Sequence, residues 1–122
     1  MKMLTIDYES IEPNIGCVRL AGALDISGVQ EVGLKFTSLT CAPRKPVIID
    51  LNDVTMITSM GLGMLITNAK SLLLHQLPTI LLNPQPNVEK VILMSGLDEI
   101  LPIEHDMNSA LKRIKGAESS AQ

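Results

Sequence analysis

Aromatic side chains are almost absent from this chain of 122 residues, which has one Tyr, one Phe and no Trp. Proteins that bind single-stranded nucleic acid use aromatic rings as stacking platforms for the bases. Lys and Arg number 10 against 13 Asp and Glu, and they are scattered rather than gathered into a basic stripe. Because nucleic-acid binding needs such a stripe, the sequence predicts no nucleic-acid partner.

Long apolar runs and a cysteine framework are missing as well. The longest apolar runs, 47–49 and 72–74, are far too short to span a bilayer, and residues 1–7 lack the apolar core of a secretory signal. Two cysteines, Cys17 and Cys41, are too few for a disulfide framework or a metal cluster, so we expect both to be reduced and structural. With 46% hydrophobic residues, we expect one soluble, cytoplasmic domain without direct membrane insertion.

Groups for catalysis are scarce. Of the two histidines, His75 lies on the order of 24 Å from Ser59 if the intervening segment is helical, too far to act as its base, and His105 cannot be placed from sequence. The stretch 58–63 has no Lys and lacks the glycine spacing of a phosphate-binding loop. We therefore expect a protein that is not an enzyme and needs no cofactor.

Three acidic residues, Asp25, Asp50 and Asp53, fall near predicted strand ends and could hold a divalent cation. Asp at such positions more often makes turn and cap hydrogen bonds, so we expect no metal site.

Hydrophobic periodicity is plentiful and predicts the first half of the fold. Alternation over 4–9 and an apolar run over 17–21 predict an antiparallel hairpin at a sheet edge. Ser27 and Gln30 have the spacing of a capping box, which predicts that a helix begins there and continues to about residue 39. The apolar segment 47–51 is typical of a strand covered on both faces.

The second half alternates in the same way. A short strand is predicted over 79–82, a helix from 86 that Gly96 ends, and a short strand near 100–103 that Pro102 confines to an edge. Asp106 is the expected N-cap of a final helix, followed by a polar tail over 116–122. The chain is thus predicted to be an α/β domain over residues 1–115, a mixed sheet of four or five strands with helices packed against it.

The stretch Thr58 to Gly63 links the central strand to a patterned segment that runs to His75, and so predicts a strand-to-helix turn. A helix N-terminus has unpaired N–H groups and the positive end of the dipole, which favour an anion. Ser59 is there either as an ordinary cap or as a modifiable hydroxyl. The apolar residues are predicted to lie on the core side of this helix. They are Leu62, Leu65, Ile66, Ala69, Leu72 and Leu73. Met60 and Met64 are predicted to lie exposed on the opposite side.

Several motifs together resemble the STAS domain family, especially bacterial anti-sigma factor antagonists. They are Asp50-Leu51-Asn52-Asp53-Val54, the segment 57–65 that contains Thr58-Ser59-Met60-Gly61-Leu62-Gly63, Met94-Ser95-Gly96-Leu97 and Gly22-Ala23-Leu24-Asp25. The resemblance runs from about residue 4 to 115 and implies the STAS fold.

The resemblance implies that Ser59 is phosphorylated by a partner that is both a serine protein kinase and an anti-sigma factor. The unphosphorylated protein would bind this partner and release a sigma factor, and a PP2C-type phosphatase would reverse the modification. The implied partner-binding residues are Asp25, Thr58, Ser59, Met60, Gly61 and Met64. Many family members have Asp where this chain has Thr58, which makes Thr58 a second candidate for the phosphate acceptor.

Two other functions fit the same fold. A STAS subunit that docks to a membrane transporter or signalling scaffold would use the same helix without phosphorylation, and a third possibility is a phosphate or GTP ligand at the turn before Ser59. For the oligomeric state, we expect a monomer or a weak dimer.

Overall fold

Four α-helices, one short 3-10 helix and five β-strands follow one another within residues 4–120, the part of the chain that the computed structural model describes. Their bounds are β1 (Thr5–Glu12), β2 (Ile15–Leu24), α1 (Ile26–Cys41), β3 (Val47–Ile57), α2 (Ser59–Leu74), β4 (Thr79–Leu82), α3 (Pro86–Ser95), η1 (Leu97–Glu99), β5 (Ile103–Glu104) and α4 (Met107–Ser120). The predicted α/β class with alternating helices and strands is confirmed.

The strands form one mixed sheet in the order β1-β2-β3-β4-β5. β1 and β2 pair antiparallel, as the predicted edge hairpin requires, and the pairs β2/β3, β3/β4 and β4/β5 are parallel. Because a parallel connection must cross over the sheet, helices α1, α2 and α3 lie between successive strands in the chain. The ends of these parallel strands therefore meet at one edge of the sheet.

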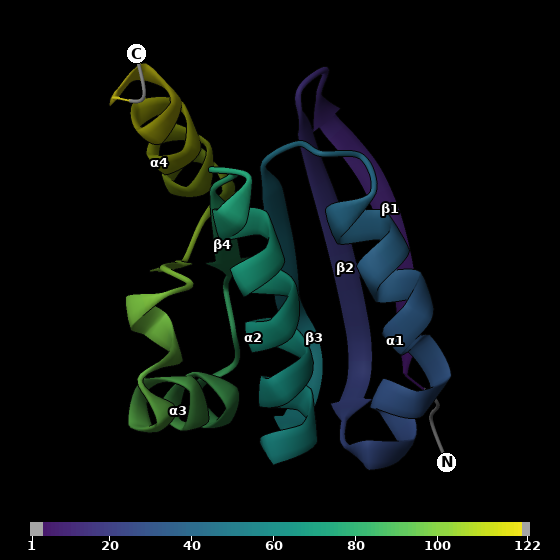
Figure 1. The fold of residues 1–122 in the computed structure, drawn as a ribbon. Coiled ribbons are helices and arrows are strands. Elements are labelled where there is room, and N and C mark those ends of the chain that lie inside the picture. Colours follow the sequence, from purple (N-terminus) through teal and green to yellow (C-terminus); the bar gives the residue numbers. More distant parts are fainter. Residues whose placement is uncertain (1–3, 121–122) are drawn as a thin grey trace.

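Helices α1, α2 and α3 cover one face of the sheet, whereas α4 covers part of the other face (Figure 1). The larger core cluster joins Phe36 of α1 and Leu65 of α2 to alternate residues of the strands, such as Ile49. The smaller cluster joins Ile114 of α4 to the intervening residues, such as Ile48. β3 is thus buried on both faces over its first half, which confirms the prediction for 47–51.

β3 runs six residues beyond the segment predicted as a strand, because its second half continues to pair with β2 as far as Ile57. The last paired residues are Asp50 and Leu82, and β4 then ends. Side-chain amides bond the exposed edge instead: Gln85 Nε2 donates to the Asn52 carbonyl at 2.9 Å and Asn87 Nδ2 to the Thr55 carbonyl at 2.8 Å. These bonds hold the end of β3, which leads into the predicted strand-to-helix turn.

Two helix boundaries differ from the prediction. The capping box at Ser27 is wrong, because α1 begins two residues earlier with Asp25 as N-cap, whose Oδ1 accepts a hydrogen bond from Gly28 N at 2.8 Å. The polar tail is also partly helical, since α4 continues through Ser120. The rest of that tail lies outside the described residues.

The other C-terminal boundaries agree with the prediction or refine it. Asp106 is the cap of α4, accepting from Ser109 N at 2.8 Å, and Gly96 ends α3 in the left-handed conformation with φ of 79°. The last strand is shorter than expected: β5 begins at Ile103, directly after Pro102, and pairs only with β4 at the sheet edge.

Candidate functional site

The candidate site lies at the edge of the sheet where β2 and β3 end and where α1 and α2 begin. The last residues of the two parallel strands, Leu24 and Ile57, are paired in register. Asp25 then leads into α1 and Thr58 into α2, and Figure 1 shows the first turns of these helices side by side. Two motifs that are far apart in the sequence therefore meet at one edge.

Thr58 is the N-cap residue of α2, with an extended backbone, but its side chain does not cap the helix. The Thr58 hydroxyl instead donates a hydrogen bond to the carbonyl of Leu24 at 3.1 Å, and the Thr58 N–H donates to the same oxygen at 3.1 Å. Thr58 is half-buried. Its hydroxyl is thus committed to the end of β2.

Ser59 is the first residue of α2 and its side chain is exposed. Among the residues that the structure describes, none forms a hydrogen bond with its hydroxyl. The interpretation of Ser59 as an ordinary cap is wrong, since the capping position belongs to Thr58. The hydroxyl of Ser59 is accessible to a reacting partner at the positive end of a helix.

Gly61 allows the first turn of α2 to approach the end of β2 closely. A Cβ atom at this position would lie 2.5 Å from the carbonyl oxygen of Leu24 and 2.9 Å from the side chain of Ile57. Such contacts are too short for any residue larger than glycine. Gly61 is therefore a buried packing residue that sets the position of Ser59, rather than a residue that a partner can touch directly.

The two methionines of α2 differ in exposure, which corrects the prediction. Met60 is 47% exposed as expected, but Met64 is 8% exposed and belongs to the larger core cluster. The reason is α1, which packs beside α2 and covers a second side of it: Asn68, one turn after Met64, is buried against Thr40 of α1. Conversely, Leu73 was predicted to face the core and is 52% exposed.

Two exposed apolar residues at the sheet edge that carries Ser59 were missed. Ile26, the first residue of α1, is 55% exposed, and Met56, near the end of β3, is 44% exposed. Met56 pairs with Ala23, one position before the end of β2, so it lies at the same sheet edge. The sequence signal was an apolar side chain beside each of the two helix starts. We call the three exposed apolar residues of this edge, Ile26, Met56 and Met60, the apolar rim.

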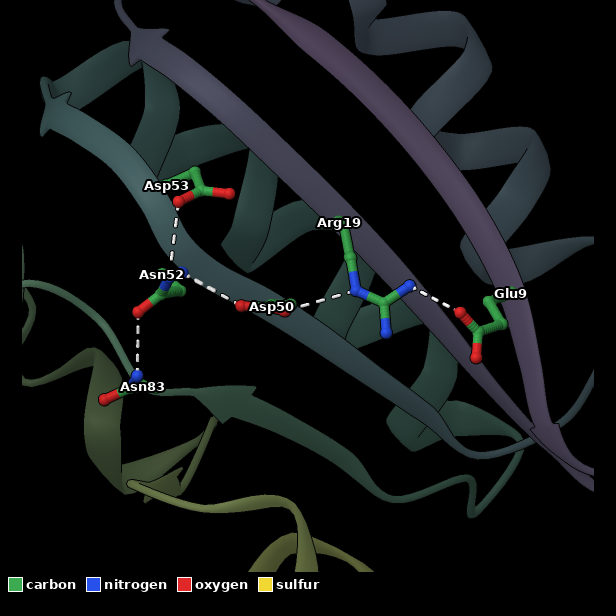
Figure 2. Close-up of polar contacts among 6 residues, drawn as sticks. All are labelled: Glu9, Arg19, Asp50, Asn52, Asp53 and Asn83. Atoms are coloured by element: carbon green, nitrogen blue, oxygen red, sulfur yellow. Dashed lines mark hydrogen bonds and ion pairs between the residues drawn. The ribbon is translucent and has the colours of Figure 1, made fainter.

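The acidic residues considered as metal ligands make other interactions. Asp25 caps α1, whereas Asp50 lies 3.4 Å from Arg19 and accepts a hydrogen bond from Asn52 N at 2.9 Å. Asp53 accepts from the amide of Asn52 at 3.2 Å, so these groups form a polar chain across the sheet (Figure 2). The part of the chain that the structure describes contains no group of three or more His, Cys, Asp or Glu arranged to hold a metal ion.

Arg19 is the cation at the centre of this chain. Its guanidinium donates to Glu9 at 2.8 Å, and this hydrogen bond is the main reason why the pKa of Arg19 lies above its usual value. Arg19 thus pairs with both Glu9 and Asp50, whereas, among the described residues, Asp53 is held by the Asn52 amide alone.

The remaining reactive side chains are placed away from Ser59. His75 is at the opposite end of α2, and His105 bonds Glu89 of α3 at 2.8 Å. Cys17 is fully buried, which raises its pKa to about 11, and Cys41 is a free, partly buried thiol at the end of α1. Neither Cys17 nor Cys41 forms a disulfide within the described residues.

The sheet edge at the starts of α1 and α2 thus combines an exposed hydroxyl, that of Ser59, with the three exposed side chains of the apolar rim. None of the helices within residues 4–120 has both the length and the apolar character needed to cross a bilayer.

The chain belongs to the STAS domain family, because the model of that domain matches residues 9–110. The fold expected from the resemblance is confirmed.

Named relatives are regulators of sigma factors. The chain is 29% identical over 100 residues to an anti-sigma F factor antagonist of Lysinibacillus sphaericus, covering 81% of this chain and 85% of that protein. It is also similar to the unphosphorylated anti-sigma factor antagonist SpoIIAA, with 25% identity, a TM-score of 0.72 and coverage of 92% and 97%. Relatives of this kind are not enzymes, which agrees with the prediction for this chain.

Two further structures extend the comparison. The phosphorylated form of SpoIIAA from Bacillus is 25% identical, with a TM-score of 0.67 and coverage of 90% and 99%. An anti-sigma factor antagonist from Mycobacterium paratuberculosis has a TM-score of 0.78 at 20% identity, with coverage of 92% and 94%, which supports the fold alone.

Proposed function

We propose that this protein is an anti-sigma factor antagonist that binds an anti-sigma factor of the serine-kinase type through the edge around Ser59, and that phosphorylation of Ser59 ends the binding. The observation that carries the proposal is the exposure of Ser59, at the first position of α2, on a sheet edge that also exposes three apolar side chains. The family of the chain and the names of its relatives supply the kind of partner.

Ser59 is a better phosphate acceptor than Thr58. The hydroxyl of Thr58 is half-buried and donates to the Leu24 carbonyl, so a kinase could reach it only after that bond breaks. Ser59 lies one residue further and is exposed. A related protein, SpoIIAA, has structures in both the unphosphorylated and the phosphorylated form. These observations favour Ser59 over the second candidate.

The apolar rim explains how a phosphate would end binding. A phosphoserine carries roughly −1.5 to −2 charges at neutral pH, and these charges would have to be desolvated inside the contact. Ile26, Met56 and Met60 offer no cation to compensate that cost. Met64 belongs to the core and stabilises α2 there, and Asp25 and Gly61 hold the two helix starts in place.

We expect phosphorylation to occur in the cytoplasm, with a PP2C-type phosphatase as the opposing enzyme. The proposal is tested in vitro with the cognate kinase. The protein is incubated with the kinase and ATP, and its intact mass is measured. When the reaction has run to completion, we expect an increase of about 80 Da for the wild type and for the more slowly reacting Thr58→Val, and no increase for Ser59→Ala. An equal increase for Ser59→Ala would contradict the assignment.

The transporter or scaffold alternative predicts a different result in the same material. A STAS subunit that docks without phosphorylation would stay bound to its partner when Ser59 is changed to Asp. Under our proposal, Ser59→Asp weakens binding of the kinase, whereas Ser27→Asp, an exposed serine in the first turn of α1, leaves it unchanged.

A further inference from the structure

One backbone oxygen, the carbonyl of Leu24, anchors the start of α2. It accepts hydrogen bonds from both the N–H and the hydroxyl of Thr58, each at 3.1 Å. The same oxygen would lie 2.5 Å from a Cβ at Gly61, so the helix backbone is packed tightly against it. The end of β2 and the first turn of α2 therefore meet at the Leu24 carbonyl. In the sequence, Ser59 lies between Thr58, which bonds this oxygen, and Gly61, which packs against it.

One of the two bonds of this anchor comes from the Thr58 backbone N–H, and the other depends on the Thr58 hydroxyl. A carboxylate has no proton to donate at neutral pH, so Asp at this position could not make the side-chain bond to the Leu24 carbonyl. Asp25 shows what a carboxylate does at a helix start in this fold: it accepts from Gly28 N, within its own helix. Thr58 can donate, and it bonds out of its helix to the neighbouring strand.

We propose that Thr58 is a positioning residue, which holds Ser59 in the orientation needed for phosphoryl transfer by fixing the first turn of α2 to Leu24. This inference rests on the function proposed above. The side chain of Thr58 itself does not receive the phosphate and need not touch the kinase. Reactions between bound groups depend steeply on alignment, and a misplacement of about 1 Å can cost on the order of 100-fold in rate.

The variants Thr58→Val and Thr58→Ser separate the hydroxyl from the rest of the side chain. Valine keeps the shape of threonine without the donor, whereas serine keeps the donor without the methyl group. We expect Thr58→Val to lower kcat for phosphorylation of Ser59 by about 10- to 100-fold with KM nearly unchanged, because the apolar rim that docks the kinase is intact. Thr58→Ser should stay within about 3-fold of the wild type. Thr58→Ala, which also lacks the donor, replaces the valine variant if that variant does not fold.

A second measurement needs no kinase. Amide hydrogen exchange of the Leu62 N–H, which donates to the Thr58 carbonyl at 2.9 Å, reports how firmly the first turn of α2 is held, and it should be faster in Thr58→Val than in Thr58→Ser. Equal exchange in the two variants would overturn the anchor, whatever the kinase does. Normal kcat for Thr58→Val with phosphate still on Ser59 would overturn the positioning role and leave the proposed function standing. Absence of phosphate on the wild type would overturn both.

Discussion

Helices α1 and α2 begin with nearly the same backbone and differ in how their first residues bond. The N-cap residues Asp25 and Thr58 have φ of −107° and −109° and ψ of −172° and 178°. Each is followed three positions later by a glycine whose added Cβ would meet a carbonyl at the end of β2: 2.3 Å for Gly28 with Ala23, and 2.5 Å for Gly61 with Leu24. The two starts are therefore built on one geometric plan.

The side chains of the two N-cap residues form different hydrogen bonds. Asp25 accepts a hydrogen bond from Gly28 N, which stabilises α1 from within. Thr58 bonds the strand, so the first N–H groups of α2 have no side-chain cap beside the exposed Ser59. A cap is typically worth about 1 kcal/mol, and α2 forgoes it. The start of α1 is therefore stabilised by a side-chain cap, whereas the start of α2 is held by its bonds to the end of β2.

The largest expected effect is on stability, and it concerns the glycine that both helices have three positions after the N-cap residue. Gly61→Ala and Gly28→Ala should each lower the free energy of unfolding by about 2 kcal/mol or more, because the new methyl group meets a backbone carbonyl that cannot move away. Urea unfolding followed by circular dichroism measures this.

Gly63→Ala is the matched control, because Gly63 is in the same helix and an added Cβ there meets nothing within 4 Å. Alanine should gain up to about 1 kcal/mol at this exposed helical position. If Gly61→Ala and Gly63→Ala were equally stable, the close approach of α2 to Leu24 would be refuted.

These glycines show where sequence reasoning stops. The turn at 58–63 and the helix after it follow from an apolar strand, a small polar segment and a 3.6-residue period, which are local signals. The close approach at Gly61 depends on Leu24, which is far away in the sequence, so no local pattern reveals it. In the sequence, Gly28 reads only as a weak helix residue, although it packs against Ala23.

The error at Met64 has the same origin. A period of 3.6 residues predicts one core side of a helix, and Leu65, Ala69 and Leu72 are indeed buried. Because α1 covers a second side of α2, Met64 and Asn68 are buried as well. Which helices lie next to each other is a property of the whole sheet order, and it could not be derived from the pattern of α2 alone.

A smaller effect is expected where the two starts differ in their caps. Asp25→Ala removes the acceptor for Gly28 N and should cost about 1 kcal/mol of stability. Ser27→Ala changes the residue that the sequence pattern favours as cap, and it should stay within about 0.5 kcal/mol of the wild type. Thermal unfolding of the two variants shows which residue caps α1. A larger loss of stability for Ser27→Ala would mean that Ser27 is the cap, as the sequence pattern predicts, and the contrast between α1 and α2 would be refuted.

The smallest expected effect concerns charge at the two starts. A negative charge near a helix N-terminus stabilises it by about 0.3 to 1 kcal/mol. α1 already has the carboxylate of Asp25 at its start, whereas α2 has no acidic residue in its first turn and no side-chain cap. Ser59→Asp should therefore gain more stability than Ser27→Asp, and thermal unfolding at low salt measures the difference.

The same Ser59→Asp variant is expected to lose its partner, so a protein that becomes more stable while binding less would show that release comes from charge on the contact surface and not from unfolding of α2. A Ser59→Asp variant that is less stable than Ser27→Asp would contradict this reasoning, because it would mean that the start of α2 has no room for an anion.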